Sequence, residues 1–459
     1  MFDTIVVRSP YDGAEVGRVP RHGPDEVDRA VAGAVAALRD RPFPPWRRAE
    51  VLDAAARLLA ERTEDFARTI ALESAKPIRT ARVEAKRAVS TFTFAAVEAR
   101  RLTGDMVPID AAEVGEGRLA FTLRVPIGVV AAISPFNFPL NLVAHKVAPA
   151  IAAGCPVVLK PASQTPLSAV ALARLLTEEC GLPAGYLHVV TGGGGDVGNA
   201  LVEHPDVAYI TFTGSSEVGR GIAAKAGHRK VALELGNNSP VIIEGDGDWA
   251  QAARTIATAG FSHAGQSCVS VQRIYVAAGV AEEFTATLAD LIDGLVVGDP
   301  LDEATDVSAL ISEGERDRVV SWVEEAVGQG AKVVAGGDVV DGILRPTVLT
   351  RMTTDMKVSR DEVFGPVVAI QAYDSLDEAL RLADDTRFGL QAGIFTSRLA
   401  SALRAARELH FGTVLVNEVP TWRADQMPYG GVRTSGNTKE GPAYAVRQMT
   451  EERLVVIKP

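Results

Sequence analysis

The chain has 459 residues, of which 47% are hydrophobic and 23% charged, and its formal net charge at pH 7 is −11. This length and composition predict an ordinary globular protein of roughly two or three domains. The acidic balance disfavours nucleic acid and anionic membranes as partners, because both repel a negatively charged surface.

The N-terminal part of the chain predicts helices. Pro24 suits a first helical turn, and amphipathic helices are expected over residues 47 to 73 and 78 to 101. The opening residues lack the cationic and apolar regions of a secretory signal, and no uninterrupted apolar run of about 18 residues occurs. We therefore expect a cytoplasmic protein that does not span a membrane.

The pattern then changes to strands. Leu119, Phe121, Leu123 and Val125 alternate with polar residues, which is typical of a half-exposed strand. From residue 128 to 212, short apolar runs alternate with helical stretches, which predicts a parallel sheet covered on both faces. A second series, with runs at 240 to 243, 271 to 276, 332 to 334 and 413 to 416, predicts a second α/β domain.

Two predicted strands have no evident local partner. They lie at residues 119 to 125 and 453 to 458, and unpaired strands of this kind are often covered in oligomers.

The chain has three cysteines, Cys155, Cys180 and Cys268. This small, odd number does not suit a disulfide framework and fits a reducing compartment. Cys155 and Cys180 have apolar or helical surroundings and are expected to be inert packing. Cys268 follows a predicted helix and a Gly265-Gln-Ser linker. It is either a small buried hydrophobe or, as a thiolate, a nucleophile for a carbonyl group.

Polar residues also stand where predicted strands end, at the edge of an α/β sheet that binds ligands. Glu234 and Lys160 end strands, and Asn137 lies in a rigid turn after another. Each has a simpler interpretation: a solvated strand end, a surface lysine, and an asparagine bonded to its own turn. Gly214-Ser215 starts a helix whose free N–H groups suit a pyrophosphate. The glycine run 192 to 195 does not fit a dinucleotide-binding turn and by itself predicts a flexible loop.

Six segments, in order, resemble the aldehyde dehydrogenase superfamily over about residues 125 to 436: Pro135-Phe-Asn137-Phe-Pro139, Val158-Leu-Lys160-Pro161, Phe212-Thr-Gly214-Ser215, Glu234-Leu-Gly236, Cys268 and Glu362-Val-Phe364-Gly-Pro366. The resemblance implies two doubly wound parallel-sheet α/β domains and a small antiparallel oligomerisation arm. The cofactor-binding domain would comprise 1–112 and 127–235, the catalytic domain 236–435, and the arm 113–126 and 436–459. A homodimer or homotetramer is implied.

The same resemblance implies site residues. Cys268 would be the nucleophile, Asn137 would donate to the oxyanion beside the backbone N–H of Cys268, and Glu234 would activate the water that hydrolyses a thioester. Lys160 would bond the adenosine ribose, and Glu362, supported by Phe364, the nicotinamide ribose. The implied contacts to NADP or NAD are Ile133, Ser134, Pro135, Phe136, Lys160, Ser163, Gly194, Phe212, Gly214, Ser215, Val218, Leu235, Gly236, Glu362 and Phe364. No metal is expected.

The chain departs from the family pattern at two positions. Asn237 stands where a second glycine is typical, which alters the turn after Glu234. Ser163 stands where NAD-preferring members usually carry a glutamate that would repel a 2′-phosphate. We therefore expect NADP to be used at least alongside NAD.

For the substrate, Trp422 and Arg423 lie where the family closes its aldehyde funnel. Arg423 would clamp a carboxylate or phosphate, or pair with Asp425. The implied reaction oxidises an aldehyde to a carboxylic acid through a cysteine thiohemiacetal and thioester, on a short or anionic aldehyde such as lactaldehyde, succinate semialdehyde or glyceraldehyde 3-phosphate. The alternatives are a CoA-acylating dehydrogenase, whose members usually lack the residue seen here as Glu234, and a non-catalytic protein that retains the fold.

Overall fold

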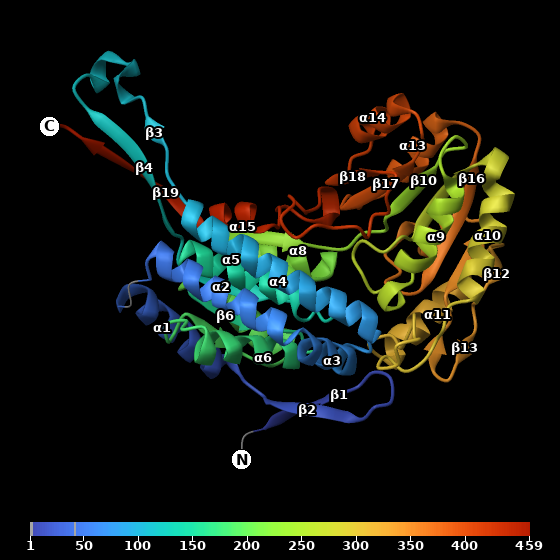
Figure 1. Ribbon diagram of the computed structural model, residues 1–459, viewed down its shortest axis with the longest axis horizontal. Coiled ribbons are helices and arrows are strands. Elements are labelled where there is room, and N and C mark those ends of the chain that lie inside the picture. Colours follow the sequence, from blue (N-terminus) through green and yellow to red (C-terminus); the bar gives the residue numbers. More distant parts are fainter. Residues whose placement is uncertain (1–2, 41–42) are drawn as a thin grey trace.

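The computed structural model describes residues 3–40 and 43–459; residues 1, 2, 41 and 42, which belong to the first predicted domain segment, lie outside it. Figure 1 shows two α/β units side by side, with an arm that extends away from the first. No helix in the described part of the chain is long and apolar enough to cross a membrane.

The N-terminal region starts with a hairpin of strands β1 (Thr4–Arg8) and β2 (Glu15–Pro20), so the prediction of helix is wrong there. The turn forms because Gly13 adopts φ 70° and its N–H donates to the carbonyl of Ser9 at 2.9 Å. Four helices follow: α1 (Pro24–Asp40), α2 (Pro45–Glu61), α3 (Thr63–Ser74) and α4 (Ile78–Arg101). The single helix expected over 47 to 73 is two helices that meet at Arg62.

The first sheet is parallel with the strand order β7-β6-β5-β8-β9. Val130 and Ala132 of β5 belong to one apolar core, and Val129, Ala131 and Ile133 to another, so helices cover both faces. The strands are β5 (Val129–Ile133), β6 (Val157–Lys160), β7 (Leu187–Val189), β8 (Val207–Thr213) and β9 (Lys230–Glu234), and the helices between them are α5 (Asn141–Ala153), α6 (Leu167–Arg174), α7 (Asn199–Glu203) and α8 (Ser216–Lys225).

The second sheet has the order β12-β15-β16-β11-β10-β17-β18 and is parallel except for β12 against β15. Its strands are β10 (Pro240–Ile243), β11 (Arg273–Ala277), β12 (Lys332–Ala335), β15 (Thr347–Thr350), β16 (Val367–Tyr373), β17 (Gln391–Phe395) and β18 (Thr413–Val416). Its helices are α9 (Trp249–Ala259), α10 (Ala281–Asp293), α11 (Glu313–Gly328), α12 (Lys357–Arg360), α13 (Leu376–Asp384) and α14 (Leu399–Glu408), and a small hairpin adds β13 (Val339–Val340) and β14 (Ile343–Leu344).

The arm is an antiparallel sheet of β3 (Met106–Val107), β4 (Leu119–Pro126) and β19 (Thr450–Ile457), and helix α15 (Pro442–Gln448) leads into its last strand (Figure 1). The two strands expected to lack a local partner pair with each other, with Leu454 opposite Thr122. The local pattern could not show this, because the partners lie at distant positions in the chain. Leu119, Leu123, Leu454 and Val456 on this arm are exposed.

Candidate active site

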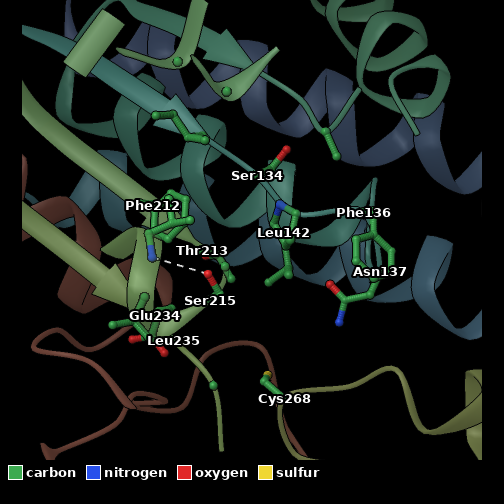
Figure 2. A pocket seen from close by; sticks show the side chains of 18 of the residues that line it. Ser134, Phe136, Asn137, Leu142, Phe212, Thr213, Ser215, Glu234, Leu235 and Cys268 are labelled. Atoms are coloured by element: carbon green, nitrogen blue, oxygen red, sulfur yellow. Dashed lines mark hydrogen bonds between the residues drawn. The ribbon is translucent and has the colours of Figure 1, made fainter. Parts of the chain in front are cut away.

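A cavity of about 640 Å³ lies at the carboxyl ends of β5, β6, β8 and β9, where loops of the second α/β unit face the first sheet (Figure 2). Most of the residues that the sequence predicted for the site line it: Ile133, Ser134, Pro135, Phe136, Asn137, Lys160, Gly194, Phe212, Gly214, Ser215, Val218, Glu234, Leu235, Gly236, Cys268, Glu362 and Phe364. Three predicted residues do not line it: Ser163, Trp422 and Arg423.

Cys268 lies in the loop between α9 and β11. The chain reaches it through His263, Ala264 and Gly265, with φ of 50°, 53° and 71°, a region that L residues rarely adopt. A Cβ on Gly265 would lie 2.1 Å from the carbonyl oxygen of Gly365, so only glycine fits there. The Cys268 Sγ lies 2.9 Å from the Tyr429 hydroxyl, and loss of hydration raises the pKa of the thiol to about 12.

Asn137 is buried in the turn after β5. Its Nδ2 donates to the carbonyl of Gln266 at 2.8 Å, not to its own turn, and an amide has a second N–H that remains for another acceptor. Figure 2 shows Asn137, Glu234 and Cys268 around the same end of the cavity. This end therefore brings together a thiol, an amide donor and a carboxylate.

Two buried charges hold the Asn137 turn. Lys76 donates to the carbonyl of Asn137 at 2.6 Å and pairs with Glu84. Glu84 in turn accepts from the backbone N–H groups of Leu140 at 2.9 Å and Asn141 at 3.1 Å. This ion pair was not predicted from the sequence.

Glu234 ends β9 and is buried, and neither of its carboxylate oxygens has a hydrogen-bond partner among the described residues. Burial, and then the negative charge of Glu440, raise the pKa of Glu234 well above its ordinary value. Glu440 itself pairs with Arg423 at 3.0 Å and Lys146 at 3.6 Å. Glu234 is thus a carboxylate with a strong tendency to take up a proton.

The other end of the cavity has buried donors with few partners. Burial lowers the pKa of Lys160 to about 8, and among the described residues its Nζ donates only to the carbonyl of Pro161, at 3.1 Å. The Ser134 hydroxyl is buried without a partner among the described residues. The Ser215 hydroxyl accepts from the N–H of Val218 at 3.4 Å and so caps α8, whose positive end faces the cavity.

Glu362 completes this end. A Cβ on Gly236 would lie 2.3 Å from Glu362 Oε2, so the glycine leaves room for the carboxylate. Glu362 accepts from the N–H of Asn237 at 2.9 Å, and burial raises the pKa of Glu362 to about 7. Free donors for anionic groups and a carboxylate acceptor for hydroxyl groups fit the phosphates and riboses of a dinucleotide.

The turn after Glu234 accepts Asn237 in place of glycine. Asn237 is not among the residues with positive φ, and its side chain donates to Ser239 Oγ at 2.8 Å and to the carbonyl of Gln391 at 3.2 Å. An asparagine here therefore anchors the turn to the second unit.

The glycine run 192 to 195 does not form the flexible loop that the sequence predicted. Residues Gly194–Gly198 form a helical turn, and Gly194 lies on the cavity wall.

The three predicted residues outside the cavity wall have other contacts. Ser163 Oγ donates to the carbonyl of Gly192 at 2.8 Å, and Trp422 is 50% exposed. The Arg423 side chain is 6% exposed, with its guanidinium 3.7 Å from the centre of the Tyr429 ring. Its carboxylate partner is Glu440 rather than Asp425, which pairs with Arg87 at 2.9 Å and His145 at 3.0 Å.

Part of the cavity wall was not predicted from the sequence. Six of these residues are apolar or small and four are polar or charged: Leu142, Ala162, Gly198, Val202, Thr213 and Ile222, with Gln164, Asn199, Glu315 and Arg318. Among the described residues, no group of three or more His, Cys, Asp or Glu side chains could hold a metal ion.

Comparisons with known proteins agree with this geometry. The model of the aldehyde dehydrogenase family matches residues 2–455. The chain is 51% identical over 433 residues to a 3-sulfolactaldehyde dehydrogenase of Priestia megaterium, covering 94% of this chain and 90% of the relative. It is 36% identical over 457 residues to a lactaldehyde dehydrogenase of Methanococcus aeolicus, covering 99% and 97%.

Solved structures are similar over nearly the whole chain. A glyceraldehyde-3-phosphate dehydrogenase of Methanocaldococcus jannaschii in complex with NADP has a TM-score of 0.95 at 36% identity, covering 100% of both chains. A betaine aldehyde dehydrogenase of Staphylococcus aureus in complex with NAD has a TM-score of 0.95 at 29% identity, covering 99% of this chain and 92% of that one. These matches confirm the predicted fold class, the resemblance, and the expected oxidation of an aldehyde with NAD or NADP.

Proposed function

The chain belongs to the aldehyde dehydrogenase family, which oxidises aldehydes with NAD or NADP, and we propose that its own substrate is a short aldehyde that carries an anionic group. Relatives named for 3-sulfolactaldehyde, lactaldehyde and glyceraldehyde 3-phosphate support this proposal, since all three compounds are three-carbon aldehydes and two are anions. We propose 3-sulfolactaldehyde or an aldehyde of similar size and charge.

One observation supports the anionic substrate more than any other. Arg423 is a buried cation that stacks on Tyr429, and the hydroxyl of Tyr429 touches the Cys268 thiol. Arg423 does not line the cavity, so its positive charge would attract a sulfonate, carboxylate or phosphate electrostatically rather than by direct contact, as the same charge acts on the Cys268 thiol. A positive charge one side chain away from the nucleophile suits a substrate whose charge lies a few bonds from its carbonyl group.

The chemistry proposed for the site uses three residues. The Cys268 thiolate attacks the carbonyl carbon, and the second N–H of Asn137 donates to the oxygen on which charge develops. Loss of hydride from the resulting thiohemiacetal carbon gives the thioester, and a nicotinamide held at the other end of the cavity would supply the hydride acceptor. Glu234 then takes a proton from the water that attacks the thioester, which releases the acid and frees the thiol. Because Glu234 lines the cavity and neither of its oxygens has a hydrogen-bond partner among the described residues, we favour hydrolysis over transfer to coenzyme A.

The same proposal assigns the other end of the cavity to the cofactor. Lys160, Ser134 and the N-terminus of α8 would receive the adenosine ribose and the pyrophosphate, and Glu362 the nicotinamide ribose. No carboxylate stands at Ser163, and Lys160 adds a positive charge nearby, which supports the use of NADP at least alongside NAD.

We also propose that the chain works as a homodimer or homotetramer, since the arm has exposed apolar side chains of the kind that subunit contacts cover. We further propose a cofactor-binding domain of 1–112 and 127–235, a catalytic domain of 236–435 and an arm of 113–126 and 436–459, which the two separate parallel sheets support. Three unpaired cysteines support a reducing compartment such as the cytoplasm.

A substrate panel tests the proposed function. NADPH or NADH formation should be followed with 3-sulfolactaldehyde, succinate semialdehyde, glyceraldehyde 3-phosphate, lactaldehyde and propanal. The anionic three-carbon aldehydes should give the highest kcat/KM. In Arg423→Met, the ratio of kcat/KM for 3-sulfolactaldehyde to that for propanal should fall roughly tenfold or more. This ratio cancels general damage to the site. A ratio that stays the same would contradict the role of Arg423.

A further inference from the structure

Tyr429 is the side chain in contact with the Cys268 sulfur, and neither the family pattern in the sequence nor the proposed mechanism uses it. Its ring is 2% exposed, and its hydroxyl lies 2.9 Å from Sγ. The phenol makes no other hydrogen bond to the described residues. A buried hydroxyl normally keeps a hydrogen-bond partner, and the partner here is the reacting atom.

The surroundings of Tyr429 fix the position of this hydroxyl. The ring packs with Val269 and Leu390, and the carbonyl of Tyr429 accepts from the N–H of Glu440 at 2.5 Å. The Arg423 guanidinium lies 3.7 Å from the ring centre, and Glu440 holds this guanidinium at 3.0 Å. A cation over the face of a phenol withdraws electron density and makes the O–H a stronger donor.

The direction of the hydrogen bond follows from chemistry. Burial raises the pKa of Tyr429 well above its ordinary value, so the phenol keeps its proton at physiological pH. A thiolate has no proton to donate. Once Cys268 is ionised, the bond therefore runs from the Tyr429 O–H to the sulfur.

We propose that Tyr429 is a catalytic residue whose hydroxyl donates a hydrogen bond to the Cys268 thiolate and thereby increases the fraction of the enzyme that is ready to attack the aldehyde. The inference rests on the proposed role of Cys268 as nucleophile. The thiol proton leaves to solvent and Tyr429 retains its own. As the sulfur lone pair forms the C–S bond, the O–H···S bond breaks, and the phenol remains neutral.

The size of the effect can be estimated. A hydrogen bond to a charged group lowers the pKa of the thiol by about one to two units. Its loss therefore lowers the thiolate fraction roughly tenfold to hundredfold at a fixed pH below the thiol pKa. A more basic thiolate is also more nucleophilic, which recovers part of this loss. The net fall in reactivity is roughly fourfold to fifteenfold.

Alkylation by iodoacetamide measures this reactivity without substrate or cofactor. The second-order rate constant at pH 8 should fall roughly fourfold to fifteenfold in Tyr429→Phe, which removes only the hydroxyl. The other charged groups that act on the thiol, Glu362, Arg423 and Glu234, stay in place. The matched control is Tyr444→Phe, at a 41% exposed tyrosine of α15, and it should react like the wild type.

A second replacement at Tyr429 shows whether slower alkylation in Tyr429→Phe comes from the lost hydrogen bond or from damage to the fold. Site-specific replacement of Tyr429 by 3,5-difluorotyrosine gives a more acidic phenol and a stronger donor, so alkylation should become faster than in the wild type. A rate that is unchanged or higher in Tyr429→Phe, or a rate that falls with difluorotyrosine, would overturn the proposal. Loss of labelling in Cys268→Ala identifies the thiol that reacts. If Cys268→Ala retained dehydrogenase activity, the proposed function would fail instead.

Discussion

The two ends of the cavity are built differently. At the cofactor end, Lys160, Phe212 and Ser215 stand at or just after the carboxyl ends of β6 and β8, the two strands that flank β5, so the backbone of that sheet sets their spacing. At the reactive end, Asn137, Cys268 and Tyr429 come from three loops distant in sequence, and their side chains contact groups of the other loops. Changes at the reactive end should therefore stop a chemical step, whereas changes at the cofactor end should alter affinity by degrees.

The largest effect is expected from Cys268→Ala. Turnover should fall to the background rate, because no thiolate remains to form the covalent intermediate, while NADP binding measured by calorimetry should persist. Cys180→Ala, a buried cysteine of the first unit, is the matched control and should keep its activity. Retention of a tenth of the wild-type turnover would remove Cys268 from the mechanism.

Glu234→Gln should separate two chemical steps at the same end. Stopped-flow absorbance should show a burst of reduced cofactor followed by steady turnover that is roughly a hundredfold to ten-thousandfold slower, because an amide cannot take a proton from water. Burial and Glu440 raise the pKa of Glu234, so it is protonated below that pKa and acts as a base above it. Wild-type hydrolysis should thus rise with pH and level off above this pKa.

This pH-dependent rise should be absent in Glu234→Gln. Added coenzyme A should not accelerate the wild type. Turnover that depends on coenzyme A would show instead that the thioester is transferred rather than hydrolysed.

At the cofactor end, Ser163→Glu should shift selectivity toward NAD by roughly tenfold or more, since a carboxylate near the adenosine ribose repels a 2′-phosphate. The measurement is kcat/KM for each cofactor. Ser163→Gln has the same size without the charge, and like Ser163→Glu it loses the bond to the carbonyl of Gly192. A strong wild-type preference for NAD that the glutamate leaves unchanged would place cofactor selection at other residues.

The smallest effect concerns Lys160, whose pKa burial lowers to about 8. The ammonium is charged below this pH and neutral above it, while the 2′-phosphate keeps its charge above pH 7. The ratio of kcat/KM for NADP to that for NAD should therefore fall between pH 7 and pH 9, on the order of fivefold for an ion pair of about 1 kcal/mol. In Lys160→Met the ratio should be flat, and a flat wild-type ratio would contradict the contact.

The sequence predicted most where the signal is local. Helix α4 and strands β10 and β18 have the expected bounds, because the periodicity of each lies within its own segment. The cavity residues at strand ends were predictable for a related reason, since the carboxyl ends of parallel strands share one edge.

Contacts between distant segments were not predictable in this way. The pairing of Lys76 with Glu84 had a signal that was overlooked: Glu84 falls on the apolar face that Ala81, Ala85 and Ala88 form on α4. The bond from Tyr429 to Cys268 and the partner of Arg423 had no local signal, because both depend on how loops meet in space.

The pairing of β4 with β19 affects the order in which parts of the chain can fold during synthesis. During synthesis from the N-terminus, β4 leaves the ribosome long before β19 exists, so the first sheet and its helices can form while Leu119 and Leu123 lack their strand partner. Throughout this interval β4 presents an open edge, which is where two nascent chains would aggregate. Because β4 and β19 lie far apart in the chain, we expect their pairing to form later than the local contacts of the first sheet. A chain that lost its last strand would retain the walls of the cavity and expose this edge permanently.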